Sequence, residues 1–405
     1  MTEIRFITAD EAPAFLRAIP FGFGDDLTEE EGAEERFLET FPLETCIAAF
    51  DGGRIVATFG SFDFDVTVPG GTLPMAGTTI VTVQPTHRRR GVLTTMMRMH
   101  LDQAIERGQP LAGLWASEPT IYGRFGYGLA AHSHDLMVHA DRVTLPAGPD
   151  TDTVRIIDPS EASELLPPIF DRVRLATPGM LSRSEPWWRN RRLRDPEHWR
   201  EGASSRRVAV AYRNDEPVGY VAYRQKEKFD DWLPDGAVEV IEVVPLDDDA
   251  RRTLWQYLAS IDLFPNVHWW NAPADNPLYV EVDNLRRITS RHQDTLYLRI
   301  LDAPGALSAR TYESDGATTI GVADDFMGRG GTFRLEITDG AGTCTPTEGD
   351  PDVTMDVADL GALLLGRPGA MARWRAGRIE GDEGSVRTLD RLMRTTELPF
   401  CSEVF

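Results

Sequence analysis

Hydrophobic and polar positions along the chain change their rhythm several times. Residues 4–9 predict a short strand, which leads into a helix-like stretch at 9–23. Residues 45–71 alternate again on both sides of a DGG turn, which predicts two antiparallel strands. A run rich in β-branched residues at 77–85 predicts another strand, which Pro85 ends. The start of the chain is therefore predicted to combine a helix with several antiparallel strands.

A second helix follows these strands. Apolar residues recur at helical spacing between Val92 and Ile105, and Gly108 ends the run. The short apolar stretch LAGLWAS at 111–117 predicts one more strand. The predicted order is strand, helix, antiparallel strands, helix and strand, with a charged loop immediately before the second helix.

The same order returns in the middle of the chain. Residues 154–173 predict a strand and a helix, and residues 206–224 predict two strands joined by a turn. Residues 238–261 predict a strand that ends at Pro245 and a helix after it. Similar order over such a length predicts that one domain has been duplicated, and chance recurrence of common α/β elements is the alternative.

The pattern changes again from about residue 291. Residues 294–310 and 318–340 predict strands with glycine-rich turns, and residues 353–383 predict a helical region with breaks. The remaining residues predict a helix and an extended tail. The predicted fold class is α/β (α+β) with three domains, which are residues 1–150, 151–290 and 291–405.

The two similar segments differ in charge where a strand passes into a helix. The first has HRRRG at 87–91, and the second has LDDDA at 246–250. The amino end of a helix carries free N–H groups and the positive end of the helix dipole. Aspartates suit that position as caps, whereas arginines oppose it unless an anion lies there. The first segment is therefore predicted to be a binding domain and the second a structural scaffold.

The arginine loop has the features of an anion site. Arg88, Arg89 and Arg90 would complement a polyphosphate at the start of the helix. Gly91 would let the backbone approach the ligand closely. A solvated run of charge is the alternative, because basic loops before helices are common.

Composition narrows the classes of function only a little. The 405 residues have a net charge of −22 and a hydrophobic fraction of 41%, as in a soluble globular protein. The negative charge argues against nucleic acid or an anionic membrane as main partner, and it is compatible with cationic substrates. No apolar run is long enough to span a bilayer, and the first residues do not have the pattern of a signal peptide.

The cysteines point to a cytoplasmic protein without a metal site. Cys46, Cys344 and Cys401 lie far apart and have no metal-ligand spacing. We expect them to be reduced thiols. The glycine-rich GRGG at 328–331 lacks a following helix and a lysine, so we interpret it as a turn.

Three stretches together closely resemble the Eis ("enhanced intracellular survival") acetyltransferases. They are PTHRRRGVL at 85–93, ASEPTIYGRFGYG at 116–128 and SEVF at 402–405. The first resembles the acetyl-CoA pyrophosphate loop of GNAT acetyltransferases, although Leu93 replaces the small residue that is usual there. The resemblance implies an active GNAT domain, a second, degenerate GNAT domain and a sterol-carrier-protein-like domain. It also implies a homohexamer.

The resemblance implies direct attack of an amine on acetyl-CoA in a ternary complex, with aminoglycosides or lysine side chains as substrates. The resemblance implies that strand residues contact the pantetheine arm and the acetyl carbonyl, namely Val81, Thr82 and Val83. The loop and first helical turn would hold the pyrophosphate through Arg88, Arg89, Arg90, Gly91, Val92, Leu93 and Thr94. After the next strand, Ser117 and Glu118 would also contact the cofactor.

Tyr122 is the expected general acid. A phenol with an ordinary pKa of about 10 is protonated at neutral pH and can donate to a leaving thiolate. Spacing alone does not choose Tyr122 over Tyr127, and both could be core aromatics. The resemblance implies that the α-carboxylate of Phe405 is the base, and the apolar tail PFCSEVF predicts a packed end. With an ordinary pKa of about 3.5, this carboxylate would mainly orient the amine and relay its proton.

Other residues are weaker candidates. Asp25, Asp26 and Glu403 would make the pocket acidic for a cationic substrate, although each could be a surface charge. His87, His132 and His134 are alternative bases, but no partner spacing supports a triad or a metal site, so we expect structural roles. The alternative function is a lipid or sterol carrier with non-catalytic GNAT-like domains.

Overall fold

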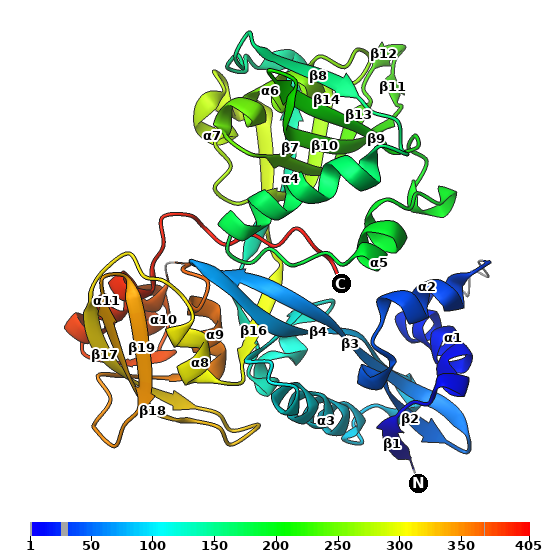
Figure 1. Cartoon of the computed structure of the whole chain (residues 1–405). Coiled ribbons are helices and arrows are strands. Elements are labelled where there is room, and N and C mark those ends of the chain that lie inside the picture. Colours follow the sequence, from blue (N-terminus) through cyan, green and yellow to red (C-terminus); the bar gives the residue numbers. More distant parts are fainter. Residues whose placement is uncertain (1, 26–30, 368) are drawn as a thin grey trace. The chain divides into compact units, whose positions relative to one another are not determined.

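The protein is described by a computed structural model that covers residues 2–25, 31–367 and 369–405 (Figure 1). These residues form two compact units. Unit 1 consists of the chain up to Ala131, Pro178–Ser182 and Thr295–Phe405. Unit 2 consists of His132–Thr177 and Arg183–Asp294. None of the helices in the described part of the chain is long and apolar enough to cross a membrane.

Unit 1 contains a seven-stranded sheet in the order β1-β2-β3-β4-β5-β16-β6. Its strands are β1 (Glu3–Phe6), β2 (Ile47–Asp51), β3 (Arg54–Val68), β4 (Gly71–Val83), β5 (Leu111–Trp115), β16 (Leu296–Ile300) and β6 (Gly128–Leu129). The helices of this part are α1 (Ala12–Phe23), α2 (Ala33–Thr40) and α3 (Val92–Glu106). The predicted elements of the first segment are therefore confirmed, although β4 begins earlier than the pattern indicated.

Strand β4 leaves its neighbour β5 part of the way along. Parallel pairing runs from Met75 to Thr78 on β4, and β4 then continues to Val83. The pairing of β4 with β3 has a register shift in this region, and Ile80 has a φ of 47°. An extra residue in one strand bends and twists that strand locally. The carboxyl ends of β4 and β5 consequently diverge.

Unit 2 contains a second seven-stranded sheet, in the order β15-β7-β14-β13-β10-β9-β8. Its strands are β7 (His132–His139), β8 (Asp152–Ile156), β9 (Arg207–Arg213), β10 (Glu216–Lys226), β13 (Ala237–Pro245), β14 (Asn266–Pro273) and β15 (Ile288–Asp294). A short hairpin consists of β11 (Phe229–Asp230) and β12 (Leu233–Pro234). The helices are α4 (Ala162–Ala176), α5 (Glu185–Trp187), α6 (Asp248–Ala259) and α7 (Leu278–Glu281).

The two sheets share one topology. From β1 to β6, and equally from β8 to β15, neighbouring strands form three antiparallel pairs, one parallel pair and two antiparallel pairs. This confirms the predicted duplication. The copies exchange one strand, because the sixth strand of the first sheet is β16 and the sixth strand of the second is β7.

A third, five-stranded sheet lies in unit 1, in the order β19-β18-β17-β20-β21. Its strands are β17 (Gly316–Ala323), β18 (Gly331–Thr338), β19 (Ala341–Pro346), β20 (Val353–Asp356) and β21 (Ile379–Gly381). Its helices are α8 (Ala303–Ser308), α9 (Val357–Leu363), α10 (Ala370–Arg375) and α11 (Glu383–Met393). The GRGG stretch forms the end of the turn before β18 and the first residue of that strand.

Helix α9 joins this third part closely to the first sheet. All its residues are buried, and it packs on β16 and β6. A Cβ atom on Gly128 would lie 1.7 Å from the carbonyl oxygen of Ala358, and one on Gly361 would lie 2.5 Å from that of Leu298. The two backbones therefore approach each other where only glycine leaves room.

Two expectations about the later chain need correction. Strands were expected throughout 294–310, but only β16 forms, and it belongs to the first sheet. Asp302 instead begins helix α8, because its carboxylate accepts a hydrogen bond from the N–H of Gly305 at 3.1 Å. The region expected to be helical from 353 starts with strand β20. The chain passes from one compact unit to the other at His132 and returns at Thr295.

Candidate active site

A cavity of about 700 Å³ in unit 1 lies where β4 and β5 diverge. Its walls come from the end of α1, the end of β4, the loop and first turn of α3, and the segment after β5. The lining residues are Gly22, Phe23, Val81, Thr82, Val83, His87, Arg88, Arg89, Gly91, Val92, Leu93, Thr94, Ser117, Glu118, Ile121, Tyr122 and Arg124. Most residues that the sequence indicated are thus brought to one cavity.

The amino end of α3 lies in the cavity wall without a side-chain cap. Gly91 is the N-cap residue, and its φ of 80° is in the left-handed region that favours glycine. Arg89 is also left-handed, with a φ of 61°. The Nε of Arg88 donates to the carbonyl oxygen of Val83 at 3.1 Å, which ties the loop to the end of β4. The dipole of α3 and the guanidinium groups of its loop all favour the binding of an anion here.

The corresponding helix start in unit 2 is closed by an acid. Asp247 is the N-cap residue of α6, and its carboxylate accepts a hydrogen bond from the N–H of Ala250 at 2.8 Å. The same carboxylate forms an ion pair with Arg213 at 2.8 Å. The expectation that aspartates act as ordinary caps in the second copy is confirmed.

Structure separates the two tyrosines that spacing could not separate. Tyr122 lines the cavity and is 7% exposed. Burial raises the pKa of Tyr122, and the charge of Glu118 adds to the shift. Tyr127 is buried in the core, where its hydroxyl group lies 2.9 Å from the Oγ1 of Thr78. Only Tyr122 can therefore meet a molecule in the cavity.

Beneath the cavity, Thr78 connects Tyr127 to a buried histidine. The Nε2 of His100 lies 2.8 Å from the Oγ1 of Thr78. Burial lowers the pKa of His100 to about 3 and raises that of Tyr127. Both groups are therefore neutral near pH 7, which suits a structural network at the last paired residue of β4.

The sequence did not indicate the contribution of α1. A Cβ atom on Gly22 would lie 2.4 Å from the Cβ of Thr82, so α1 rests directly on β4. Phe23 follows and lines the cavity while remaining 50% exposed. The signal was a glycine between two aromatic residues at the end of a predicted helix. Arg124 was missed as well, although it lies inside the IYGRFGYG stretch.

The histidines take the structural roles that we expected. His87 lines the cavity, but its Nε2 is paired with the carboxylate of Asp51 at 3.0 Å. His134 lies on β7, and its Nδ1 is 2.6 Å from the hydroxyl of Tyr279. The ring of His132 packs on a further histidine of unit 2.

Five residues that were expected at the site are not among those that line the cavity in the described part of the chain. Arg90 is exposed beside the cavity loop, and Asp25 is exposed two residues after Phe23. Asp26 lies outside the described residues. Glu403 is 1% exposed. The fifth residue is Phe405, at the end of the tail.

Phe405 packs against the first sheet within unit 1. Its ring centroid lies 5.1 Å from that of Phe64 on β3. A Cβ atom on Gly77 would lie 3.3 Å from the ring of Phe405. Gly77 immediately precedes Thr78, the last residue of β4 that pairs with β5. The tail therefore reaches the point where the two strands separate.

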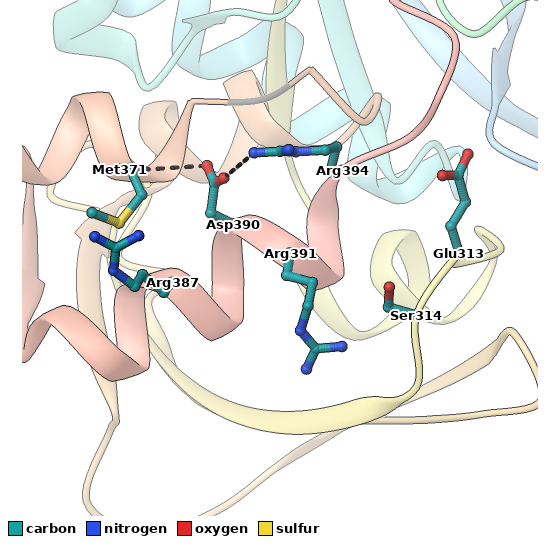
Figure 2. Close-up of a pocket in the computed structure, with 7 residues that line it drawn as sticks. All are labelled: Glu313, Ser314, Met371, Arg387, Asp390, Arg391 and Arg394. Carbon is teal, nitrogen blue, oxygen red and sulfur yellow. Dashed lines mark hydrogen bonds and ion pairs between the residues drawn. The ribbon is translucent and has the colours of Figure 1, made fainter.

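A different recess lies beside α11 in the third part of unit 1 (Figure 2). Three arginines line this space of about 280 Å³. Arg394 is paired with Asp390 at 2.6 Å, Arg387 is paired with Glu383 at 2.5 Å, and Arg391 donates to a backbone carbonyl group. All three guanidinium groups therefore have partners within the protein. No cluster of potential metal ligands occurs among the described residues.

Known protein families match all three parts of the chain. Residues 3–130 and 179–300 each match an acetyltransferase (GNAT) domain family. Residues 303–402 match a sterol carrier protein domain family.

Similar proteins cover nearly the whole chain. It is 38% identical to an N-acetyltransferase of Streptomyces avermitilis, with 93% of each protein covered. It is 32% identical to the N-acetyltransferase Eis of Mycobacterium tuberculosis, over 98% of this chain and 96% of that protein. The crystal structure of Eis1 from Mycobacterium abscessus covers 100% of both chains, with 28% identity and a TM-score of 0.85. The similarity therefore extends to the order of all three domains.

Proposed function

The chain belongs to the Eis family of N-acetyltransferases, and from this premise we propose that it acetylates primary amines of cationic substrates. The two GNAT domains make it an acyltransferase, and the GNAT fold implies acetyl-CoA as co-substrate. The proposed acceptors are aminoglycosides or lysine side chains. The proposed reaction is direct attack of the amine in a ternary complex.

One observation carries this proposal: the cavity unites the uncapped start of α3 with Tyr122. The cavity of about 700 Å³ is of the size that small-molecule sites usually have. Arg88, Arg89 and the free N–H groups of the first helical turn fit a pyrophosphate. Val81, Thr82 and Val83 extend beyond the parallel pairing with β5, and their position fits the pantetheine arm.

Tyr122 is the proposed general acid. Acetyl-CoA, when bound, supplies the acetyl thioester. The phenol group of Tyr122 would donate its proton to the sulfur that leaves. Burial raises the pKa of Tyr122, so the group remains protonated across the neutral range. A positioned acid of this kind typically contributes about 10²- to 10⁴-fold in rate.

The α-carboxylate of Phe405 is the proposed partner of the attacking amine. The support is the packing of its ring on Phe64 and Gly77, at the separation of β4 and β5. A carboxylate held there would orient an ammonium group and accept its proton through water. Asp25 and Glu403 remain proposals for the acidic side of the substrate pocket, together with the net charge of −22.

Thiol release from acetyl-CoA tests the proposal. We expect release to depend on a cationic amine, with kanamycin and a lysine peptide as probes and a neutral alcohol as control. Release that does not rise with either amine would contradict acetylation of this class of acceptor. A protein that binds lipid vesicles but shows no amine-dependent turnover would instead support the carrier function.

A further inference from the structure

A loop from the sterol-carrier-like domain packs on the segment that carries Tyr122. Residues 324–330 connect β17 to β18. The ring of Phe326 meets that of Phe125 edge-on, with 5.0 Å between the centroids. Phe326 and Met327 pack against the core cluster that contains Tyr122 and Phe125. The loop therefore packs against the segment that contributes Tyr122 to the cavity wall.

The same loop is attached to the helix that begins at the anion site. The guanidinium group of Arg98 on α3 lies 4.8 Å above the ring of Phe326. One of its nitrogens, Nη2, also donates to the carbonyl oxygen of Phe326. Phe326 thus lies between α3 and the tyrosine segment, in contact with both.

A buried ion pair fixes the base of this loop. The side chains of Arg299 on β16 and Asp324 are 0% and 3% exposed. The Nη2 of Arg299 donates to both carboxylate oxygens of Asp324, at 2.9 and 2.7 Å. Asp324 also accepts from the N–H of Met327 at 3.1 Å, which shapes the turn. Among the described residues, the Nε and Nη1 atoms of Arg299 have no hydrogen-bond partner, so Asp324 holds this cation alone.

Arg299 lies directly beneath the backbone of the tyrosine segment. Gly126 has a φ of 84°, and a Cβ atom there would lie 1.8 Å from the Nη1 of Arg299. The carbonyl oxygen of Tyr122 accepts hydrogen bonds from the N–H groups of Phe125 at 3.0 Å and Tyr127 at 3.3 Å. Tyr122 is therefore bonded to the residues on both sides of Gly126.

We propose that the sterol-carrier-like domain positions the catalytic tyrosine, through Phe326 packed on Phe125 and through the Arg299–Asp324 ion pair beneath Gly126. This inference rests on the proposed function, because it takes Tyr122 as the acid. None of these positioning residues lines the cavity. Their effect reaches the reaction only through the orientation of the 122–127 segment.

A double-mutant cycle with Tyr122→Phe tests the proposal. Phe326→Ala removes the ring contact, and we expect kcat with kanamycin and acetyl-CoA to fall about tenfold, because small misplacements of catalytic groups are costly. CoA affinity, measured by calorimetry, should change by less than about twofold, because Phe326 does not line the cavity. In the Tyr122→Phe background, Phe326→Ala should cause no further loss of kcat.

Matched variants separate positioning from simple loss of folding. Phe326→Leu should recover most of the kcat, and Asp325→Asn, an exposed acid in the same loop, should leave kcat near that of the wild type. Asp324→Asn leaves a buried cation unpaired and is therefore informative only if CoA binding shows a folded protein. Amide exchange of residues 123–127 should become faster in Phe326→Ala without CoA present, and it should not in Asp325→Asn.

The possible results separate the two proposals. If Tyr122→Phe alone keeps the wild-type kcat, the acid assignment in the proposed function fails. If Tyr122→Phe is impaired but Phe326→Ala keeps the wild-type kcat, only the positioning role fails. An equal loss of kcat from Phe326→Ala in both backgrounds would also overturn it, since the loop would then act by another route.

Discussion

The two copies of the acetyltransferase fold differ most clearly at the starts of helices α3 and α6. Both helices follow the fourth strand of sheets with the same topology. At α6, Asp247 closes the helix end and neutralises its dipole with a carboxylate. At α3, Gly91 leaves the end without a side-chain cap, and Arg88 and Arg89 add positive charge.

This difference shows how one backbone serves two purposes. Free N–H groups at a helix end need partners, and a protein usually supplies them itself. The start of α3 has no side-chain cap and carries cations, so we expect a bound ligand to be the partner of its N–H groups. The second copy satisfies its helix end internally, which suits a scaffold. Charge at a few positions therefore distinguishes the two copies more sharply than topology does.

The largest expected effect is on the rate of acetyl transfer, which we propose takes place in the first copy. Tyr122→Phe should lower kcat by about 100-fold or more, because the variant lacks the hydroxyl group that we propose as proton donor. Calorimetric affinity for CoA should remain nearly unchanged. Tyr127→Phe is the matched control, since that hydroxyl bonds to Thr78 in the core. Equal losses of kcat in the two variants would contradict the assignment.

The next effect concerns the anion site itself. The double variant Arg88→Ala and Arg89→Ala should weaken CoA binding by about 10- to 100-fold, because charge-assisted hydrogen bonds are lost. Arg90→Ala should weaken binding by a few-fold at most, since Arg90 does not line the cavity. The measurement is the CoA dissociation constant at fixed salt. A larger loss for Arg90→Ala would place the anion elsewhere on the loop.

A third effect concerns the pH dependence of stability in unit 2. Hydrogen bonds to Glu239, and then to Asp135, raise the pKa of His268 to about 9. This pKa lies above the value of about 6.5 in the unfolded chain, so protonated His268 stabilises the folded state. The stabilisation is full below pH 6.5 and is lost as the pH rises through 9. At pH 6, the free energy of unfolding of the wild type should exceed that of His268→Gln by on the order of 1–2 kcal/mol. A difference in unfolding free energy that stays constant to pH 9.5 would contradict this origin.

The smallest effect concerns the cap of the second copy. Asp247→Ala should lower the free energy of unfolding by about 1 kcal/mol, because the N–H of Ala250 loses its acceptor. CoA affinity should not change. Asp248→Ala, in the first turn of the same helix, is the control, and denaturant titration gives the comparison. Weaker CoA binding in Asp247→Ala would show that the second copy takes part in the site.

The sequence predicted the local elements and the duplication because both depend on short-range pattern. It did not predict that β16 belongs to the first sheet, since the choice of a neighbouring strand depends on pairing between residues far apart in the chain. Helix α8 was missed because its start is marked only by the capping residue Asp302, which is a weaker sequence signal than the strand pattern before it.

The site was predicted in part for the same physical reasons. The HRRRG loop was visible because its charge conflicts with a helix start. Tyr122 and Tyr127 were indistinguishable, because only burial and the bond to Thr78 separate them. Gly22 matters through its contact with Thr82, which lies far from it in the chain, so the glycine between two aromatic residues did not reveal that contact.

Calorimetric titration of CoA into the full chain tests the central claim most directly. If the open, cationic start of α3 is the site and the capped start of α6 is not, each chain binds one CoA. That binding disappears at the same CoA concentrations in the Arg88→Ala and Arg89→Ala double variant. Two CoA molecules per chain, or none for the wild type, would contradict the distinction between the two copies.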